Sequence, residues 1–379
     1  MFFLNEEHRL FKKAVDDFVE KEAPREKVRL WHRDGTFPYE IYQKMAELGW
    51  LGTSVPPAYG GMGLDAVFVT LLCEGLARYT FELSLGFSSV NWGVERLIRF
   101  GTEKQRQRFL PAVAKGEVRF SPSFTEPDAG SDLASITTSA TARGDHFVLN
   151  GQKIFNSGAD LKDNYLTVAA RTDKEAPRHK GITVFLVHNE TPGVTIKRLD
   201  FPARRIVSLN EVYYDEVKAP KDMVVGEVNR GWEVVVSQLE MERINGAAGY
   251  VGTSQTAVED AMEYAKQRVQ FGRPIAKFQV IKHMLVDMQT EVDAARLLVY
   301  RVAFLVRDGV RCAKEASMAK LYASEVFQRV TANGIQIMGA YGLVGDSDML
   351  RYFLEACPST IGGGTSQIQR EIIAEQMGL

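Results

Sequence analysis

Apolar residues recur at steps of three and four along residues 4–23, which predicts an amphipathic helix. Asn5 stands at the start of this run and is expected to cap its first turn, while Pro24 ends or bends it. Thr102 holds the same capping position before a later helical run. We therefore predict an N-terminal all-α domain over residues 1–118.

The pattern changes to alternation in the middle of the chain. Stretches rich in β-branched and aromatic residues cover residues 146–155, 165–171, 181–188, 193–199 and 210–220. The Asn150–Gly151 pair inside the first stretch is typical of a two-residue hairpin turn. We predict a middle antiparallel β-domain over residues 119–228.

Helical periodicity returns after this region. Apolar positions from Phe278 to Val302 recur at alternating steps of three and four, which indicates a helix of about 30 residues and roughly 45 Å. Such a stripe is typical of a helix in a bundle, so we predict a C-terminal bundle domain over residues 229–379. The order helical, β, helical favours three packed units over a single domain.

The composition argues against two classes of protein. Of the 379 residues, 45% are hydrophobic and 25% are charged, which is too apolar and too balanced in charge for a disordered chain. The 46 basic and 48 acidic residues leave a net charge of −2, so we expect no nucleic-acid partner.

The cysteines and the apolar runs bear on the compartment. Cys73, Cys312 and Cys357 are far apart and lack a Cys-X-X-Cys pair, so we expect neither a disulfide framework nor a metal site. No apolar run approaches the roughly 18–20 residues that span a bilayer, so no membrane span is expected. The first residues lack a signal-peptide core, which favours a cytoplasmic location of bacterial type.

Five short motifs are candidates for binding chemistry. They are Phe120–Asp132 (FSPSFTEPDAGSD), Asn150–Ala159 (NGQKIFNSGA), Arg268–Gln279 (RVQFGRPIAKFQ), Gln336–Gly342 (QIMGAYG) and Ile361–Arg370 (IGGGTSQIQR). Locally, each has a structural interpretation as a turn, a bulge, a helix corner or a glycine loop, and a functional one as a contact to a polar or flat cofactor. None is a Walker or Rossmann glycine motif, so a nucleotide would occupy a different kind of site.

Together and in this order, the motifs resemble those of the acyl-CoA dehydrogenase family over nearly the whole chain. The resemblance implies an α+β multidomain fold with an N-terminal helical domain, a central antiparallel β-domain and a C-terminal four-helix bundle. It also implies non-covalent FAD at a subunit interface, an acyl-CoA substrate and a homotetramer built as a dimer of dimers, or sometimes a dimer. Electrons would pass to an electron-transfer flavoprotein or, as in oxidase relatives, to oxygen.

The resemblance assigns site residues by position. It implies flavin contacts at Phe124, Thr125, Ser131, Phe155, Ser157, Thr365 and Gln367. It implies contacts to the adenosine diphosphate half of a neighbouring subunit's FAD at Arg268, Phe271, Gln336 and Gly339. It implies substrate contacts at Ser131, Arg243, Ser88, Asn91, Trp92 and Gly362. Phe155 stands where the family has a tryptophan. The phenylalanine ring keeps an apolar face but lacks the indole N–H.

The catalytic base is the point where the chain departs from much of the family. Gly363 matches a glutamate that removes the substrate α-proton, although its backbone N–H remains available to the thioester carbonyl. Residues 239–249 offer Glu240 and Glu242, and isovaleryl-type and crotonobetainyl-type members combine a helix glutamate before an arginine with a small loop residue. We expect Glu242 to be the base, with a pKa raised by the apolar flavin pocket.

Substrate and chemistry stay open at this point. The glycines around residue 363 and the volume of Trp92 favour short, branched or cyclic acyl groups over long straight ones. One alternative is altered chemistry, such as a 1,4-elimination on a cyclic enoyl-CoA, or binding of a CoA thioester without oxidation. Another is a non-enzymatic helical scaffold, which predicts that no FAD is bound.

Overall fold

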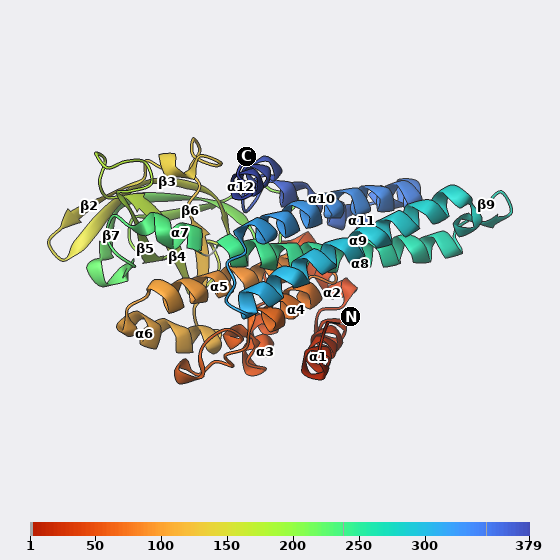
Figure 1. Ribbon diagram of the computed structural model, residues 1–379, viewed down its shortest axis with the longest axis horizontal. Helices are drawn as coiled ribbons and strands as arrows, with labels where there is room; N and C mark the ends of the chain where they lie inside the picture. The colour runs from red at the N-terminus through yellow and green to blue at the C-terminus, as the bar shows by residue number, and fades with distance from the viewer. Residues whose placement is uncertain (1–2, 238, 346) are drawn as a thin grey trace. The chain divides into compact units, whose positions relative to one another are not determined.

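The computed structural model describes residues 3–237, 239–345 and 347–379, whose contacts divide the chain into two compact units (Figure 1). The first, here called the helical unit, comprises Met1–Asp34, Asp65–Leu85 and Glu240–Leu379. The second, the sheet unit, comprises Gly35–Leu64 and Gly86–Leu239. The helices of the first third of the chain are therefore shared between the two units.

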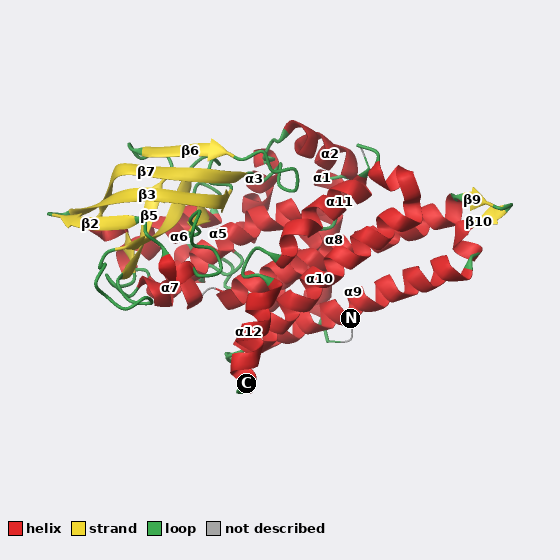
Figure 2. Ribbon diagram, turned by 90° about the horizontal axis from the view of Figure 1, so that it is seen from above, coloured by secondary structure: helices red, strands yellow, loops and turns green. Residues whose placement is uncertain are grey.

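The helical unit contains the long helices of the molecule. Its helices are α1 (Glu6–Glu22), α2 (Arg25–Asp34), α4 (Ala66–Leu76), the start of α5 (Phe81–Phe100), α8 (Leu239–Gln267), α9 (Gln279–Arg307), α10 (Ala313–Met338), α11 (Asp348–Ala356) and α12 (Ser366–Met377), with short 3-10 turns at Ile275–Lys277, Gly339–Leu343 and Cys357–Thr360. Helix α10 packs against α9, α11 and α12, and α4 packs against α1 and α9. A small hairpin of β9 (Val269–Gln270) and β10 (Arg273–Pro274) joins α8 to α9 at their far end (Figure 2).

The predicted helix signals are confirmed where they were placed. Asn5 precedes α1, and its Oδ1 accepts a hydrogen bond from the backbone N–H of His8 at 2.8 Å. Thr102 and Gln105 form a reciprocal capping box at the start of α6 (Glu103–Ala114) in the sheet unit. The apolar stripe lies on α9, where Met288, Val292, Ala295, Val299 and Val302 are buried.

The sheet unit is built around an eight-stranded sheet among the described residues. Its strands are β1 (Arg119–Ser123), β2 (Ser139–Arg143), β3 (His146–Ser157), β4 (Asn164–Arg171), β5 (Ile182–His188), β6 (Val194–Arg198), β7 (Leu209–Pro220) and β8 (Val224–Val225), in the spatial order β6-β7-β3-β2-β4-β5-β8 with β1 paired to β4. Helices α3 (Tyr39–Glu47), α6, α7 (Gly231–Ser237) and the end of α5 accompany it, with 3-10 turns at Trp50–Gly52, Pro57–Tyr59, Leu133–Ser135 and Lys221–Met223.

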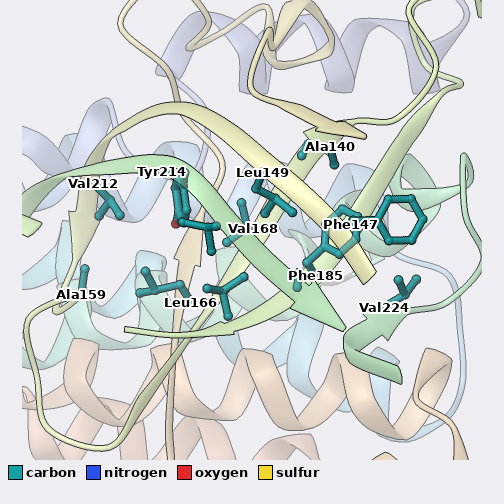
Figure 3. Packing of buried hydrophobic residues seen from close by; sticks show 14 residues of the cluster. Ala140, Phe147, Leu149, Ala159, Leu166, Val168, Phe185, Val212, Tyr214 and Val224 are labelled. Carbon is teal, nitrogen blue, oxygen red and sulfur yellow. The ribbon is translucent and has the colours of Figure 1, made fainter. Parts of the chain in front are cut away.

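The core of the sheet unit forms where alternate side chains of the strands meet (Figure 3). Phe147 and Phe185 lie ring to ring at 5.1 Å in an edge-on arrangement, and Leu149 and Leu166 are fully buried beside them. Burial of these large apolar groups, at about 1.5–3 kcal/mol for each side chain, fixes the faces of β3 and β4.

Two sequence expectations need correction here. The sheet is mixed, because β1 pairs with β4 in parallel; the chain between them is long enough to cross over through β2 and β3. Asn150–Gly151 is not a hairpin turn, since β3 runs through it with a bulge against β7. Gly151 has φ +152° there, and a Cβ would lie 2.5 Å from the hydroxyl of Thr138, so only glycine passes this crossing.

Among the described residues, each helix is too short or too polar to cross a lipid bilayer.

Candidate active site

The helical unit brings the proposed base and the glycine loop together. Glu242 lies in the first turn of α8 with a half-buried side chain, and Gly363 lies in the loop that leads into α12. A Cβ on Gly363 would stand 3.4 Å from Oε1 of Glu242. The carboxylate from the helix therefore reaches the position from which a side chain at residue 363 would start. The side chain of Glu240, the other candidate, lies outside the described part.

The loop itself is fixed by hydrogen bonds to its carbonyl groups. Gly363 and Gly364 have φ values of +66° and +91°, a backbone conformation that favours glycine. The side-chain amide of Gln369 donates to the carbonyls of Gly363 and Gly364 at 3.0 and 3.1 Å. Thr365 then caps α12 by accepting from the backbone N–H of Ile368 at 3.2 Å. These bonds hold the peptide groups that directly follow the Gly363 N–H, so they restrain the loop beside it.

A lysine that the sequence analysis missed completes this group. Lys320 of α10 is 2% exposed, and its ammonium donates to the Gly364 carbonyl at 2.7 Å. Burial lowers the pKa of Lys320 to about 8, while attraction to Glu242 opposes this shift and repulsion from buried Arg243 adds to it. The signal was present in the sequence, since Lys320 lies among buried Ala316, Ala319 and Ala323 on the inner face of the helix.

The sheet unit presents its candidate flavin contacts from a bulge and a loop. The register of β3 shifts between Lys153 and Asn156, and Phe155 in this bulge has φ +60° and is 54% exposed. Lys153 is fully buried, and its ammonium donates to the Phe124 carbonyl and to Glu126 Oε1, both at 2.8 Å. The loop that carries Phe124 and Thr125 is thus tied to the strand that carries Phe155 and Ser157.

Glu126 is the most heavily bonded carboxylate of this loop. It accepts hydrogen bonds from the backbone N–H groups of Thr137 and Thr138 at 2.7 and 2.9 Å, as well as from Lys153. Burial alone would raise the pKa of Glu126, but attraction to Lys153 and these hydrogen bonds lower it to about 2. Glu126 is therefore an anchor and not a base. Ser131 lies further along the same loop and is exposed.

The three predicted acyl-pocket residues lie on the part of α5 that belongs to the sheet unit. Ser88, Asn91 and Trp92 are 2%, 3% and 6% exposed. The Asn91 amide donates to the hydroxyl of Ser54 at 2.7 Å. The buried indole N–H of Trp92 meets no acceptor among the described residues.

Arg268, Phe271, Gln336 and Gly339 gather at the other end of the helical unit. The Arg268 guanidinium lies 5.6 Å from the ring of Tyr341, which closely follows Gly339. Gln336 stands 16 residues after Lys320 on α10 (336 − 320), a distance of about 24 Å along the helix. Within one chain, this group is therefore far from Glu242 and Gly363.

Backbone strain marks two of the predicted FAD contacts, one to the flavin and one to the adenosine diphosphate half. The described non-glycine residues with positive φ are Phe155, Asp163, Glu216, Asn229 and Phe271. Phe155 and Phe271 are the two aromatic members, and Phe271 at the hairpin tip is 93% exposed. Such conformations cost about 1–3 kcal/mol and are typical of ligand sites. Exposed aromatic rings held in this way suit the flat rings of FAD.

One cluster has the composition of a metal site. Ligand atoms of His32, Glu82 and Glu355 in the helical unit lie within 4.8 Å of one another. However, Glu355 accepts hydrogen bonds from the Thr80 hydroxyl and the Phe81 backbone N–H, both at 2.7 Å, at the start of α5. We therefore interpret Glu355 as a cap of the first turn of α5 and not as a metal ligand.

Comparison with known families agrees with this arrangement. Models of the acyl-CoA dehydrogenase N-terminal, middle and C-terminal domains match residues 5–117, 121–217 and 229–378. The chain belongs to the acyl-CoA dehydrogenase family. The predicted fold, the enzyme class and the FAD cofactor of this family are thereby confirmed, and the non-enzymatic scaffold is excluded.

Individual relatives cover the chain almost completely. The 3-(aryl)acrylate reductase of Clostridium sporogenes is 36% identical over 99% of both chains. A subunit of the caffeyl-CoA reductase–Etf complex of Acetobacterium woodii is 35% identical over 98% of both chains. The structure of butyryl-CoA dehydrogenase from Megasphaera elsdenii superimposes with a TM-score of 0.95 at 32% identity over 100% of both chains.

Proposed function

We propose that this acyl-CoA dehydrogenase uses Glu242 as the base that removes the α-proton of its thioester substrate. The observation that carries the proposal is the 3.4 Å between Glu242 Oε1 and the Cβ position of Gly363. A carboxylate placed there can serve the reaction that the loop residue serves in much of the family. When bound, FAD supplies the acceptor for the hydride that leaves the β-carbon.

The remaining residues hold the thioester. The backbone N–H of Gly363 donates to the thioester carbonyl, where negative charge develops as the α-proton leaves; a donor of this kind contributes about 3 kcal/mol. Arg243 and Ser131 contact the CoA thioester, and Phe124, Thr125, Phe155, Ser157, Thr365 and Gln367 contact the flavin. The absence of side chains at Gly362 and Gly363 leaves room beside the α-carbon, which favours a short, branched or cyclic acyl group.

A second candidate direction is reduction of an enoyl thioester with an aryl group on its β-carbon. It is favoured by the 36% identity to a 3-(aryl)acrylate reductase. The same geometry serves this direction, because a protonated Glu242 would return its proton to the α-carbon. The buried indole N–H of Trp92 and the amide of Asn91 give the acyl pocket polar groups that an aromatic acyl group with hydroxyls would match.

We extend the proposal to the assembly and the redox partner. The separation of about 24 Å between Lys320 and Gln336 supports the view that Arg268, Phe271, Gln336 and Gly339 hold the adenosine diphosphate half of a neighbouring subunit's FAD. This arrangement requires at least a dimer and suits a tetramer. The similarity to a subunit of an Etf complex supports an electron-transfer flavoprotein as partner.

The test is anaerobic mixing of the protein with straight, branched, cyclic and aryl-substituted acyl-CoA thioesters, followed by flavin absorbance. Glu242→Gln is expected to slow bleaching by about 10²–10⁴-fold, because the proton acceptor is lost. Glu240→Gln is the matched control and should bleach at nearly the wild-type rate. Bleaching of Glu242→Gln at the wild-type rate would disprove the base. Fastest bleaching by long straight chains would disprove the substrate class.

A further inference from the structure

We propose that Lys320 is a positioning residue of the reaction, which orients the thioester-binding loop through Gly364 and keeps the base Glu242 ionised. The proposal rests on the role of Glu242 proposed above. It assigns a function to a cation that is only 2% exposed.

The first argument is the hydrogen bond to the loop. The ammonium of Lys320, on α10, donates to the Gly364 carbonyl in the loop before α12 at 2.7 Å. The Gly364 carbonyl lies in the peptide group that joins Gly364 to Thr365, directly after the peptide group between Gly363 and Gly364, whose carbonyl Gln369 holds. A charged donor binds a carbonyl about twice as strongly as a neutral one. Lys320 therefore restrains the loop just after Gly363, whose N–H meets the developing negative charge in the proposed function.

The second argument is the set of charges around Lys320. Glu242 and Arg243 act on it from α8, and Glu325 acts on it from α10 itself. Glu325 has its own cation, because Arg370 donates to its carboxylate at 2.8 Å. Attraction between the ammonium and Glu242 raises the pKa of Lys320, and the same attraction favours the carboxylate form of Glu242 in our proposal. A base that is to accept a proton from carbon must be ionised when substrate arrives.

The desolvation penalty of burying the Lys320 ammonium also favours a role in the reaction. Burying an ammonium carries a large desolvation penalty, and a methionine of similar length would fill the same space without it. Burial lowers the pKa of Lys320 to about 8, so the cation is expected to lose its proton just above neutral pH in the free protein. The rate of α-proton removal is then expected to fall above pH about 8 in the wild type.

The experiment separates proton removal from hydride transfer. The probe is a saturated acyl-CoA whose β-carbon is replaced by sulfur, because its α-proton can leave but no hydride can follow. Formation of the carbanion beside the flavin is followed as long-wavelength absorbance between pH 6 and pH 10. Binding is measured in parallel by displacement of a fluorescent CoA. Each variant is also tested for FAD content and thermal unfolding.

Three variants give distinct expectations. In Lys320→Met the apparent pKa of the bound α-proton should rise by about one unit, so carbanion formation at neutral pH falls about tenfold. In Lys320→Arg the decline above pH 8 should disappear, because a guanidinium stays protonated. Lys314→Met, which removes a half-buried lysine near the start of the same helix, is the control and should match the wild type.

The outcomes also separate this proposal from the one on which it rests. If Glu242→Gln still forms the carbanion, the base is elsewhere, whatever Lys320 does. If Glu242→Gln forms no carbanion, but Lys320→Met keeps the wild-type pH midpoint of carbanion formation and only unfolds at a lower temperature, Lys320 has a structural role and the proposal is wrong. If Lys320→Met does not bind FAD, the test rests on Lys320→Arg. If carbanion formation in Lys320→Arg still declines above pH 8 as in the wild type, the proposal is overturned.

Discussion

Lys153 of the sheet unit and Lys320 of the helical unit are built alike but placed beside different carboxylates. Each is almost fully buried, each donates to a loop carbonyl at 2.8 or 2.7 Å, and burial lowers the pKa of each to about 8. Lys153 also bonds Glu126 directly, whereas Lys320 acts on Glu242 through space.

The difference shows how one kind of residue serves two purposes. Glu126 receives Lys153 and two backbone N–H groups, so its proton affinity is very low and it only holds the loop. Glu242 Oε1 lies 3.4 Å from the Cβ position of Gly363, and in our proposal it meets the α-carbon of the substrate there. A buried ammonium thus makes an anchor where it bonds a carboxylate directly, as Lys153 bonds Glu126. In our proposal, it supports a reactive group where it acts on the carboxylate through space, as Lys320 acts on Glu242.

The largest expected effect comes from removing the anchor. Lys153→Met should lower the free energy of unfolding by about 3–5 kcal/mol, because Glu126 stays buried without its cation. The matched change Lys320→Met removes a hydrogen bond to a neutral carbonyl and should cost only about 1–3 kcal/mol. Urea unfolding followed by fluorescence measures both. Equal losses of unfolding free energy in the two variants would mean that the charge of Glu242 needs Lys320 as much as the charge of Glu126 needs Lys153.

A double variant controls for lost packing in this comparison. Lys153→Met combined with Glu126→Gln removes both charges and should regain part of the stability lost in the single variant. No recovery would show that the loss comes from the shape of the lysine side chain and not from its charge.

The acid dependence of stability sharpens the same contrast. The pKa of Glu126 is lowered from 4.5 to about 2, so its stabilisation is complete above pH about 4.5 and is lost as the pH falls toward 2. A shift of this size corresponds to roughly 3 kcal/mol. Thermal unfolding between pH 2 and pH 6 should therefore be flatter in Glu126→Gln than in the wild type. Glu175→Gln, at an exposed loop position, should retain the wild-type slope.

The smallest effect on stability is expected at the strained aromatic of the helical unit. Phe271→Gly relieves a positive φ of +51° at a side chain that is 93% exposed, so the free energy of unfolding should rise by about 1 kcal/mol. FAD should nevertheless dissociate more readily, as measured by filtration and absorbance. Gln270→Ala in the same hairpin is the control. Full FAD retention by Phe271→Gly would remove Phe271 from the proposed cofactor contacts.

The sequence predicted those features that depend on local chemistry. Asn5 and Thr102 cap helices because each side chain satisfies backbone groups within three residues, and the stripe on α9 follows from the helical period. The combination of Glu242 with a glycine at position 363 was readable because both lie in recognisable motifs, and the structure places them in contact distance.

Features that depend on distant partners were missed. Asn150–Gly151 became a bulge because β7 pairs through it, and nothing in the local sequence distinguishes a bulge from a turn. Lys320 was overlooked because its partners, Gly364 and Glu242, lie 44 and 78 residues away along the chain (364 − 320 and 320 − 242). The predicted domain boundaries at residues 118 and 228 remain predictions.

The interleaved course of the chain has a consequence for synthesis on the ribosome. The sheet unit ends at Leu239, so it is complete while the last 140 residues (379 − 239) are still to be made. The helical unit needs both ends of the chain, because α4 packs against α9. The sheet unit is therefore expected to fold first. Until α9 emerges, Val67 and Leu71 of α4 can pack against Leu4 near α1 but lack Tyr300 and Ala303, so this part of the core is expected to form last.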